Sequence, residues 1–121
     1  MVIFDANMIL RFLLNDNKEM ADIAERHLET GEVMVTIEVV AEVVYVLKGV
    51  YSLGREVIVA TIKNFLNFVI CEKCDVLSLA FDTYGTYNLD FIDCVLYAYN
   101  KVYNFTIATF DKKLMKIIMN D

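Results

Sequence analysis

Short apolar segments alternate with longer segments of helical spacing along this chain, and this alternation limits the fold more than any other feature. The apolar segments are residues 1–4, 33–36, 69–71 and 105–109. Such runs, separated by helices, predict parallel strands, because helices on both faces of a parallel sheet bury its strands. We therefore expect an α/β fold, a three-layer α/β/α sandwich around a central parallel sheet of four to five short strands.

The intervening segments carry start and stop signals for helices. Asn17 and Thr36 stand where helix N-caps are favoured, and Gly31 stands just past an expected helix end. Helices are expected at residues 6–14, 17–30, 37–50, 55–68, 75–84, 90–103 and 112–119. A chain of 121 residues with no proline, repeat or linker predicts one domain over residues 1–121.

Composition limits where the protein acts and what it binds. Hydrophobic residues make up 58% of the chain, enough for a sizeable core, but no apolar run reaches the roughly 20 residues that span a bilayer. The N-terminus does not resemble a signal peptide, so a cytoplasmic protein without membrane contact is expected. The net charge of −6 is unusual for a nucleic-acid enzyme, although Lys112, Lys113 and Lys116 form a basic cluster.

Several familiar kinds of functional site are excluded because the sequence lacks the residues that form them. No G-x-G-x-x-G or P-loop is present, and neither Ser52 nor Ser78 lies in a hydrolase motif. The single C-x-x-C of Cys71 and Cys74 is too little for a structural zinc site, which needs four ligands. The aromatic residues are interpreted as core or interface side chains rather than as base-stacking platforms; they include Phe65, Phe68, Tyr97, Tyr99 and Tyr103.

Four acids lie in apolar surroundings: Asp5, Glu42, Asp93 and Asp111. A carboxylate surrounded by apolar sequence is expected to be desolvated, paired or bound to a cation. Since few cationic neighbours are close in sequence and hard divalent cations take oxygen ligands, the four predict a Mg²⁺ or Mn²⁺ site. Asp5 and Asp111 both follow expected strands, so both are expected at the carboxyl edge of the sheet, where ligands of such folds gather.

Each acid also has a structural interpretation. Asp5 and Asp111 could each cap the following helix. Glu42 could be a solvated residue, and Glu38 on the same helix face competes with it, although Glu38 is nearer the helix start, where any acid is favoured.

Asp90 and Asp93 could form a capping-box-like pair, with Asp90 at the N-cap. Asn7 could orient a carboxylate or only bond the turn, and Thr109 could support a ligand or only fill a strand. Asp93 is therefore a predicted ligand, whereas Asn7, Asp90 and Thr109 are possible supporting residues.

In order and spacing, four segments of the chain resemble PIN-domain ribonucleases, and most closely the short toxins of toxin–antitoxin pairs. The segments are Phe4-Asp5-Ala6-Asn7, residues 41–47 around Glu42, Leu89-Asp90-Phe91-Ile92-Asp93, and residues 108–114 around Asp111. The resemblance implies that Asp5, Glu42, Asp93 and Asp111 form a catalytic metal site with Mg²⁺ or Mn²⁺. Ala6 departs from the family, which often has threonine there.

The resemblance further implies hydrolysis of RNA phosphodiester bonds, a small antitoxin partner and a homodimer, the last through helix faces near Val44 and Ile58. One alternative is a catalytically idle PIN-like module that holds a protein partner or a cation in its acidic crevice. Another is a phosphoacceptor domain of the receiver type, which the sequence disfavours because the first strand offers only Asp5 and no late strand ends in lysine.

Overall fold

The computed structural model describes residues 1–120, which form three strands and seven helices in two compact units. The N-terminal unit is Met1–Glu72, and the C-terminal unit begins at Lys73. Each unit is described by itself. No helix within residues 1–120 combines the length and the apolar character needed to cross a membrane.

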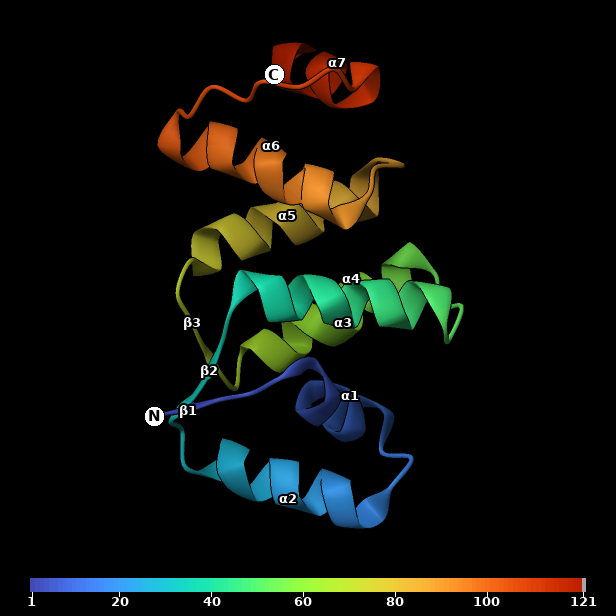
Figure 1. The fold of residues 1–121 in the computed structure, drawn as a ribbon, viewed down its shortest axis with the longest axis vertical. Coiled ribbons are helices and arrows are strands. Elements are labelled where there is room, and N and C mark those ends of the chain that lie inside the picture. The colour runs from blue at the N-terminus through green and yellow to red at the C-terminus, as the bar shows by residue number, and fades with distance from the viewer. Residues whose placement is uncertain (121) are drawn as a thin grey trace. The chain divides into compact units, whose positions relative to one another are not determined.

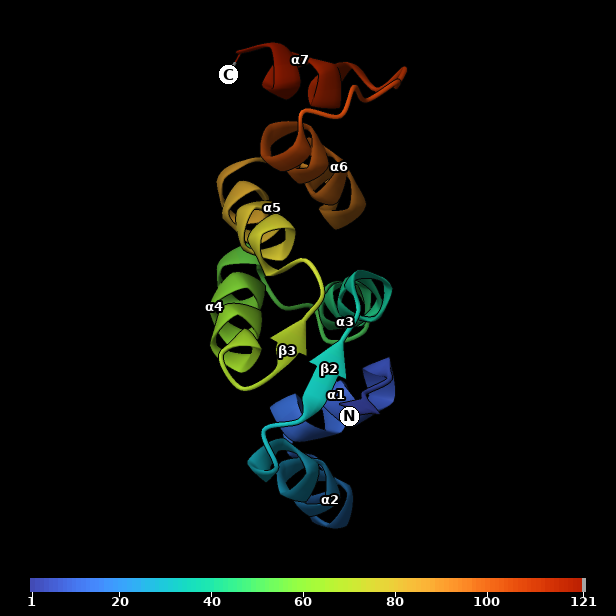
Figure 2. The same cartoon turned by 90° about the vertical axis from the view of Figure 1, so that its left-hand side faces the viewer.

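The N-terminal unit contains a parallel sheet in the order β1-β2-β3. Its strands are β1 (Val2–Ile3), β2 (Val33–Val35) and β3 (Ile70–Cys71), and Val2 pairs with Val33 while Val35 pairs with Cys71. The central strand is the most buried, since Val33 and Val35 are both inaccessible to solvent. The parallel sheet predicted from the apolar runs is confirmed at these three segments (Figures 1 and 2).

Four helices complete the N-terminal unit, and side-chain caps set where three of them begin. They are α1 (Ala6–Leu14), α2 (Lys18–Glu29), α3 (Ile37–Gly49) and α4 (Arg55–Leu66). Asn17 accepts a hydrogen bond from the Met20 amide at 3.1 Å, and Thr36 accepts one from the Val39 amide at 3.3 Å, so both predicted caps are confirmed. Gly31 has a φ of 72°, the left-handed conformation expected of a glycine just past a helix end.

The core of the N-terminal unit contains buried residues from all four of its helices and from its strands. Helix α1 contacts both α2 and α3, and α3 contacts α4 (Figure 1). Val44 on α3 and Ile58 on α4 are buried, so these two side chains are not available to a dimer face, and the expected homodimer stays a prediction. Both side chains already belong to the core of one chain.

The C-terminal unit is helical and contains α5 (Cys74–Thr86), α6 (Phe91–Tyr103) and α7 (Lys112–Asn120). Helix α6 lies between the other two and contacts both, as Figures 1 and 2 show. Helix α5 is longer than predicted and continues through Gly85 to Thr86. The glycine costs only about 1 kcal/mol in a helix interior, which packing of α5 against α6 offsets.

The strand predicted at residues 105–109 is not observed as a strand. These residues have an extended course without ladder partners among residues 1–120, and the sheet has three strands there instead of four to five. A strand is defined by hydrogen bonds to a neighbouring strand. An apolar run in the sequence can indicate one strand, but it does not indicate which segment pairs with it. The number of strands in the expected sandwich is therefore not confirmed.

Candidate functional site

Asp5 stands directly after β1 and Phe4, beyond the carboxyl end of the first strand. It is the N-cap of α1, and its Oδ1 accepts a hydrogen bond from the Met8 amide at 2.8 Å. The position at the edge of the sheet and the capping interpretation are therefore both confirmed. Asp5 is exposed, and its Oδ2 makes no hydrogen bond to any of residues 1–120, so the cap leaves one carboxylate oxygen open to a ligand.

A shallow pocket of about 210 Å³ adjoins Asp5. Its lining residues are Asp5, Asn7, Met8, Arg11, Met20 and Ile23. The structure thus brings Asn7, the predicted supporting residue, to the same pocket as Asp5. Arg11 was not predicted to belong there. Its guanidinium forms an ion pair with Asp16 at 2.7 Å, and a hydrogen bond to the Tyr51 hydroxyl raises the pKa of Arg11 further.

No sequence pattern would have found Arg11. Asn15 ends α1 in the left-handed conformation with a φ of 49°, and this turn brings Asp16 back to the helix that carries Arg11. An arginine and an aspartate five residues apart are not neighbours on a helix surface. Their contact depends on the conformation of one asparagine, which the pattern of apolar residues does not specify.

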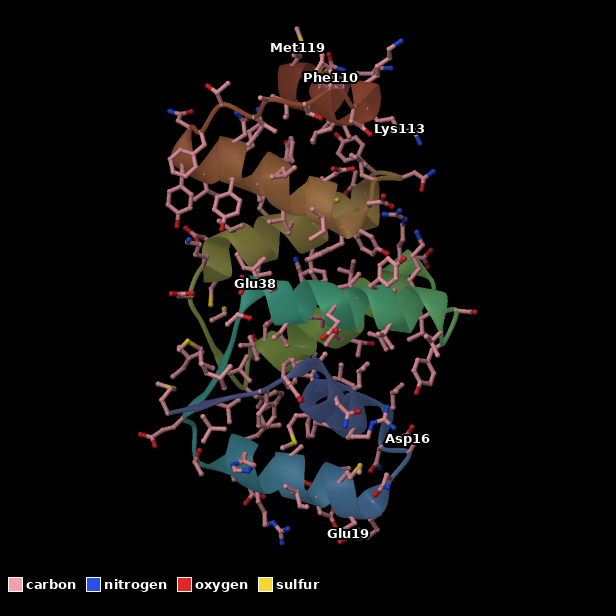
Figure 3. The ribbon with its side chains drawn as sticks, viewed as in Figure 1. Asp16, Glu19, Glu38, Phe110, Lys113 and Met119 are labelled. Carbon is pink, nitrogen blue, oxygen red and sulfur yellow. The ribbon has the colours of Figure 1, made fainter. Side chains whose placement is uncertain are left out.

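Glu42 lies on the solvent side of α3, and so does Glu38 one turn earlier. Glu38 lies in the first turn of α3, as Figure 3 shows. The apolar neighbours Val40, Val43 and Leu47 point inward, because the helical period of 3.6 residues places them on the opposite face. Glu42 therefore has the solvated position that its structural interpretation described, and its role as a ligand stays a prediction.

Three acids of the C-terminal unit share one pocket of about 300 Å³. They are Asp90 and Asp93 from the start of α6 and Asp111 from the start of α7. The full lining is Asn88, Leu89, Asp90, Asp93, Asp111, Lys112 and Lys113. Two of the four predicted ligands, Asp93 and Asp111, therefore line the same pocket within this unit.

The surroundings of Asp93 oppose the ionisation of its carboxyl. Partial burial raises the pKa of the Asp93 carboxyl above its usual value of 3.8, and the negative charges of Asp111 and Asp90 raise it further. Like charges held in one pocket make ionisation of each carboxylate more costly. A bound cation would relieve this repulsion, so the pocket has the electrostatic character of a cation site.

The helix starts in this pocket differ in how they are capped. Asp111 Oδ1 accepts a hydrogen bond from the Leu114 amide at 2.9 Å, as its capping interpretation predicted. Thr109 Oγ1 accepts a hydrogen bond from the Asp111 amide at 3.0 Å, so Thr109 fixes the backbone that carries this acid. Asp90 occupies the N-cap position of α6, but its side chain makes no capping hydrogen bond, which corrects the predicted capping box.

The four predicted ligands are thus divided between the two units. Asp93 and Asp111 share a pocket in the C-terminal unit, whereas Asp5 and Glu42 belong to the N-terminal unit. Within residues 1–120, no three acidic, histidine or cysteine side chains are arranged closely enough to hold a metal ion. The donor set nevertheless fits a hard divalent cation, because it consists of carboxylate oxygens with an amide and a hydroxyl beside them.

Two residues of the acidic pocket, Lys112 and Lys113, were predicted only as part of a basic cluster. Both follow Asp111 directly and line the pocket with it, and Figure 3 labels Lys113 near the start of α7. Their proximity to Asp111 in sequence was the signal for this placement. The pocket therefore combines three carboxylates with two ammonium groups, which offset part of its negative charge.

The raised pKa of Asp93 has a consequence for stability. A carboxyl whose folded-state pKa is raised stabilises the fold while it is protonated, and this contribution is lost as the pH rises through the folded-state pKa. Ionised Asp93 therefore destabilises the protein at pH 7. We expect Asp93→Asn to melt at a higher temperature than the parent at pH 7 in chelator, with a difference that shrinks toward zero below pH 3.8.

Thermal melting followed by circular dichroism checks this expectation. Glu25→Gln is the control, since Glu25 is exposed on α2, and it should show no such pH-dependent gain. An Asp93→Asn protein that melts below the parent at pH 7 would contradict the repulsion in the pocket.

Comparison with known proteins identifies the family. A model of the PIN domain matches residues 2–118. No curated protein and no solved structure gives a match. PIN domains are usually nucleases and typically bind divalent metals. Since the match covers nearly the whole sequence and includes all four predicted acids, the chain belongs to the PIN domain family.

Proposed function

We propose that the protein is a metal-dependent endoribonuclease and the toxin component of a toxin–antitoxin system. The observation that carries this proposal is the acidic pocket of Asp90, Asp93 and Asp111 in a chain of the PIN domain family. The resemblance to the family assigns Asp93 and Asp111 to the metal site, and both line that pocket. Asp5 and Glu42 complete the proposed set of four ligands for Mg²⁺ or Mn²⁺.

The roles of the side chains follow from their chemistry. Asp5 and Asp111 each use one oxygen as a helix cap and keep a second oxygen for a cation. Asp93 contributes a carboxylate whose ionisation is favoured once positive charge is present. Asn7 and Thr109 support their neighbouring acids, and Asp90 adds negative charge at the same pocket.

A bound divalent cation would lower the pKa of a water molecule and neutralise charge on the scissile phosphate. The carboxylates would hold the cation and accept hydrogen bonds from the reacting water, which orients that water. Lys112 and Lys113 offer positive charge to the flanking phosphates from the same pocket. No side-chain nucleophile is required for this hydrolysis, which agrees with the absence of any nucleophile motif in the sequence.

The proposed partner is a small antitoxin with a basic segment. The charge of the chain is unevenly divided, because Met1–Glu72 carries eleven acids against six lysines and arginines, a difference of −5. An excess of acid on one unit favours a basic partner through complementary charge. A homodimer and a cytoplasmic location are also part of the proposal, with RNA as substrate and no membrane contact.

The alternative is a catalytically idle module that binds a cation or a protein partner through the same acids. The acidic pocket of Asp90, Asp93 and Asp111 supports this alternative too, because holding a cation or a basic partner needs the carboxylates but no cleavage. Calorimetry distinguishes the two, because an idle module would bind Mn²⁺ without cleaving any RNA in a varied set of substrates.

Cleavage should depend on the cation. The parent protein with a labelled RNA pool should show no cleavage in chelator and should regain cleavage when Mn²⁺ or Mg²⁺ is added. Binding to the folded state alone raises stability by about 2.7 kcal/mol at a cation concentration one hundred times Kd. Mg²⁺ should therefore also raise the melting temperature. Cleavage that persists in chelator would contradict the proposal.

The two exposed glutamates of α3 provide a matched comparison. Glu42→Gln should reduce cleavage by at least about a hundredfold, a loss comparable with removing one transition-state contact in other enzymes. Glu38→Gln should retain cleavage, since both residues are exposed on the same helix and only Glu42 is a proposed ligand. Initial rates of RNA cleavage with Mn²⁺ decide between them. The reverse pattern would show that the ligand is Glu38.

Substitutions of Asp5 separate its two roles. Asparagine caps a helix as well as aspartate does, whereas alanine at an N-cap costs about 1 kcal/mol. Asp5→Asn should therefore unfold like the parent and lose cleavage, while Asp5→Ala should lose both stability and cleavage. Urea unfolding and cleavage rates, measured on the same preparations, test this. An Asp5→Asn protein with the parent's cleavage rate would remove Asp5 from the proposed ligands.

A further inference from the structure

Three aromatic rings form a cluster at the end of α6 in the C-terminal unit. Phe105 lies nearly parallel to Tyr99, at 15° and 6.3 Å between ring centroids, and nearly parallel to Tyr103, at 24° and 5.5 Å. Tyr99 and Tyr103 are themselves 6.0 Å apart. We call Tyr99, Tyr103 and Phe105 the aromatic cluster. It was not predicted, because the sequence favoured core or interface positions for its tyrosines.

The end of α6 holds these rings in place. Asn104 adopts the left-handed conformation with a φ of 62°, which turns the chain back toward the helix. The Asn100 side chain donates a hydrogen bond to the Phe105 carbonyl oxygen at 2.9 Å and fixes the turn. An apolar contact across a helix end of this kind is common, and it explains why Phe105 meets Tyr99. The rings are thus positioned before any ligand arrives.

That structural role does not account for the exposure of the rings. Phe105 is 55% exposed and Tyr103 is 41% exposed, whereas Phe65 and Tyr97, which were also predicted as core or interface residues, are buried. Exposed aromatic faces that are fixed in advance suit flat ligands, because little side-chain entropy remains to be lost on binding. The faces of nucleobases are flat and bind to aromatic side chains by stacking.

A positive charge accompanies the cluster. Lys73 Nζ lies 5.5 Å from the centroid of the Tyr99 ring, within the range of a cation–π contact. Proteins that bind single-stranded nucleic acid combine basic side chains, which contact phosphates, with aromatic rings, which stack on bases. Lys73 and the aromatic cluster are a combination of this kind.

The charge of this unit also opposes RNA binding less than that of the whole chain does. From residue 73 onward the sequence has five lysines against six aspartates, a difference of −1, compared with −6 for all 121 residues.

We infer that the aromatic cluster stacks with a nucleobase of single-stranded RNA on the strand that enters the acidic pocket. This inference rests on the proposed function for its choice of ligand. Asp93 and Tyr103 are ten residues apart on α6, which places them about 15 Å apart along the helix axis. A single strand with bases spaced about 3.4 Å apart covers that length with roughly four nucleotides. The stacked base therefore lies a few nucleotides from the scissile bond.

Binding to labelled RNA without cleavage tests the inference. The probes are a fluorescein-labelled octauridylate and an abasic octamer with the same backbone, and fluorescence anisotropy is measured in chelator at low salt. Phe105→Ala should weaken binding of the octauridylate by on the order of tenfold and leave the abasic octamer nearly unchanged. Phe105→Leu should also weaken it, since leucine keeps the apolar bulk but has no aromatic face.

Matched controls make the result specific. Phe68 is as exposed as Phe105, at 55%, and has no aromatic neighbour among the residues described, so Phe68→Ala should bind like the parent. Tyr103→Phe keeps the ring and should also bind like the parent, whereas Tyr103→Leu should not. The two leucine variants decide the question if Phe105→Ala fails to fold, as judged by circular dichroism.

Several outcomes would overturn the inference. They are a parent protein that binds both octamers equally, a Phe105→Leu protein that binds octauridylate as tightly as the parent, and a Phe68→Ala protein that loses as much affinity as Phe105→Ala. A change of oligomeric state on gel filtration for Phe105→Leu would assign the cluster to a protein interface instead. Cleavage with Mn²⁺ is measured separately, so RNA binding that needs Phe105 without any cleavage would contradict the nuclease proposal and leave the stacking surface intact.

Discussion

The hydrogen bond between a carboxylate and the first turn of a helix is the interaction on which the candidate site depends. Asp5 fixes the start of α1 in this way, and Asp111 fixes the start of α7. Each bond satisfies a backbone amide that the helix itself leaves open, and it also holds the acid in a defined direction. Structural and chemical roles are therefore combined in the same side chains, and a single carboxylate has enough oxygens to perform both.

The local features of the fold were readable from the sequence because they depend on neighbouring residues. Asn17 and Thr36 cap helices as predicted, and the bounds of α1 agree with the spacing of its apolar residues. Long-range features were less accessible. The segment of residues 105–109 has the composition of a strand, but it forms none. A strand needs a neighbouring strand to pair with, and composition does not predict which segment that is. The turn at Asn15, which brings Asp16 to Arg11, could not be predicted from the sequence either.

The candidate site shows the same division. Asp93 and Asp111 were expected together and share a pocket, because both stand at helix starts of one compact unit. The sequence left open whether Glu42 is desolvated or solvated, and it is exposed because its apolar neighbours in sequence lie on the other face of α3. Sequence neighbours describe the environment of a helix residue poorly, since the helix turns successive side chains in different directions. The aromatic cluster was missed for a related reason, as it depends on the left-handed conformation of Asn104.

The makeup of the aromatic cluster also gives the protein an optical signal of its own. The chain contains no tryptophan and seven tyrosines, so its near-ultraviolet emission comes from tyrosine. Two of the seven stand in the cluster beside Phe105. A base that stacked on these rings would quench part of that emission, and the unlabelled protein would then report occupancy of this surface by a loss of tyrosine fluorescence.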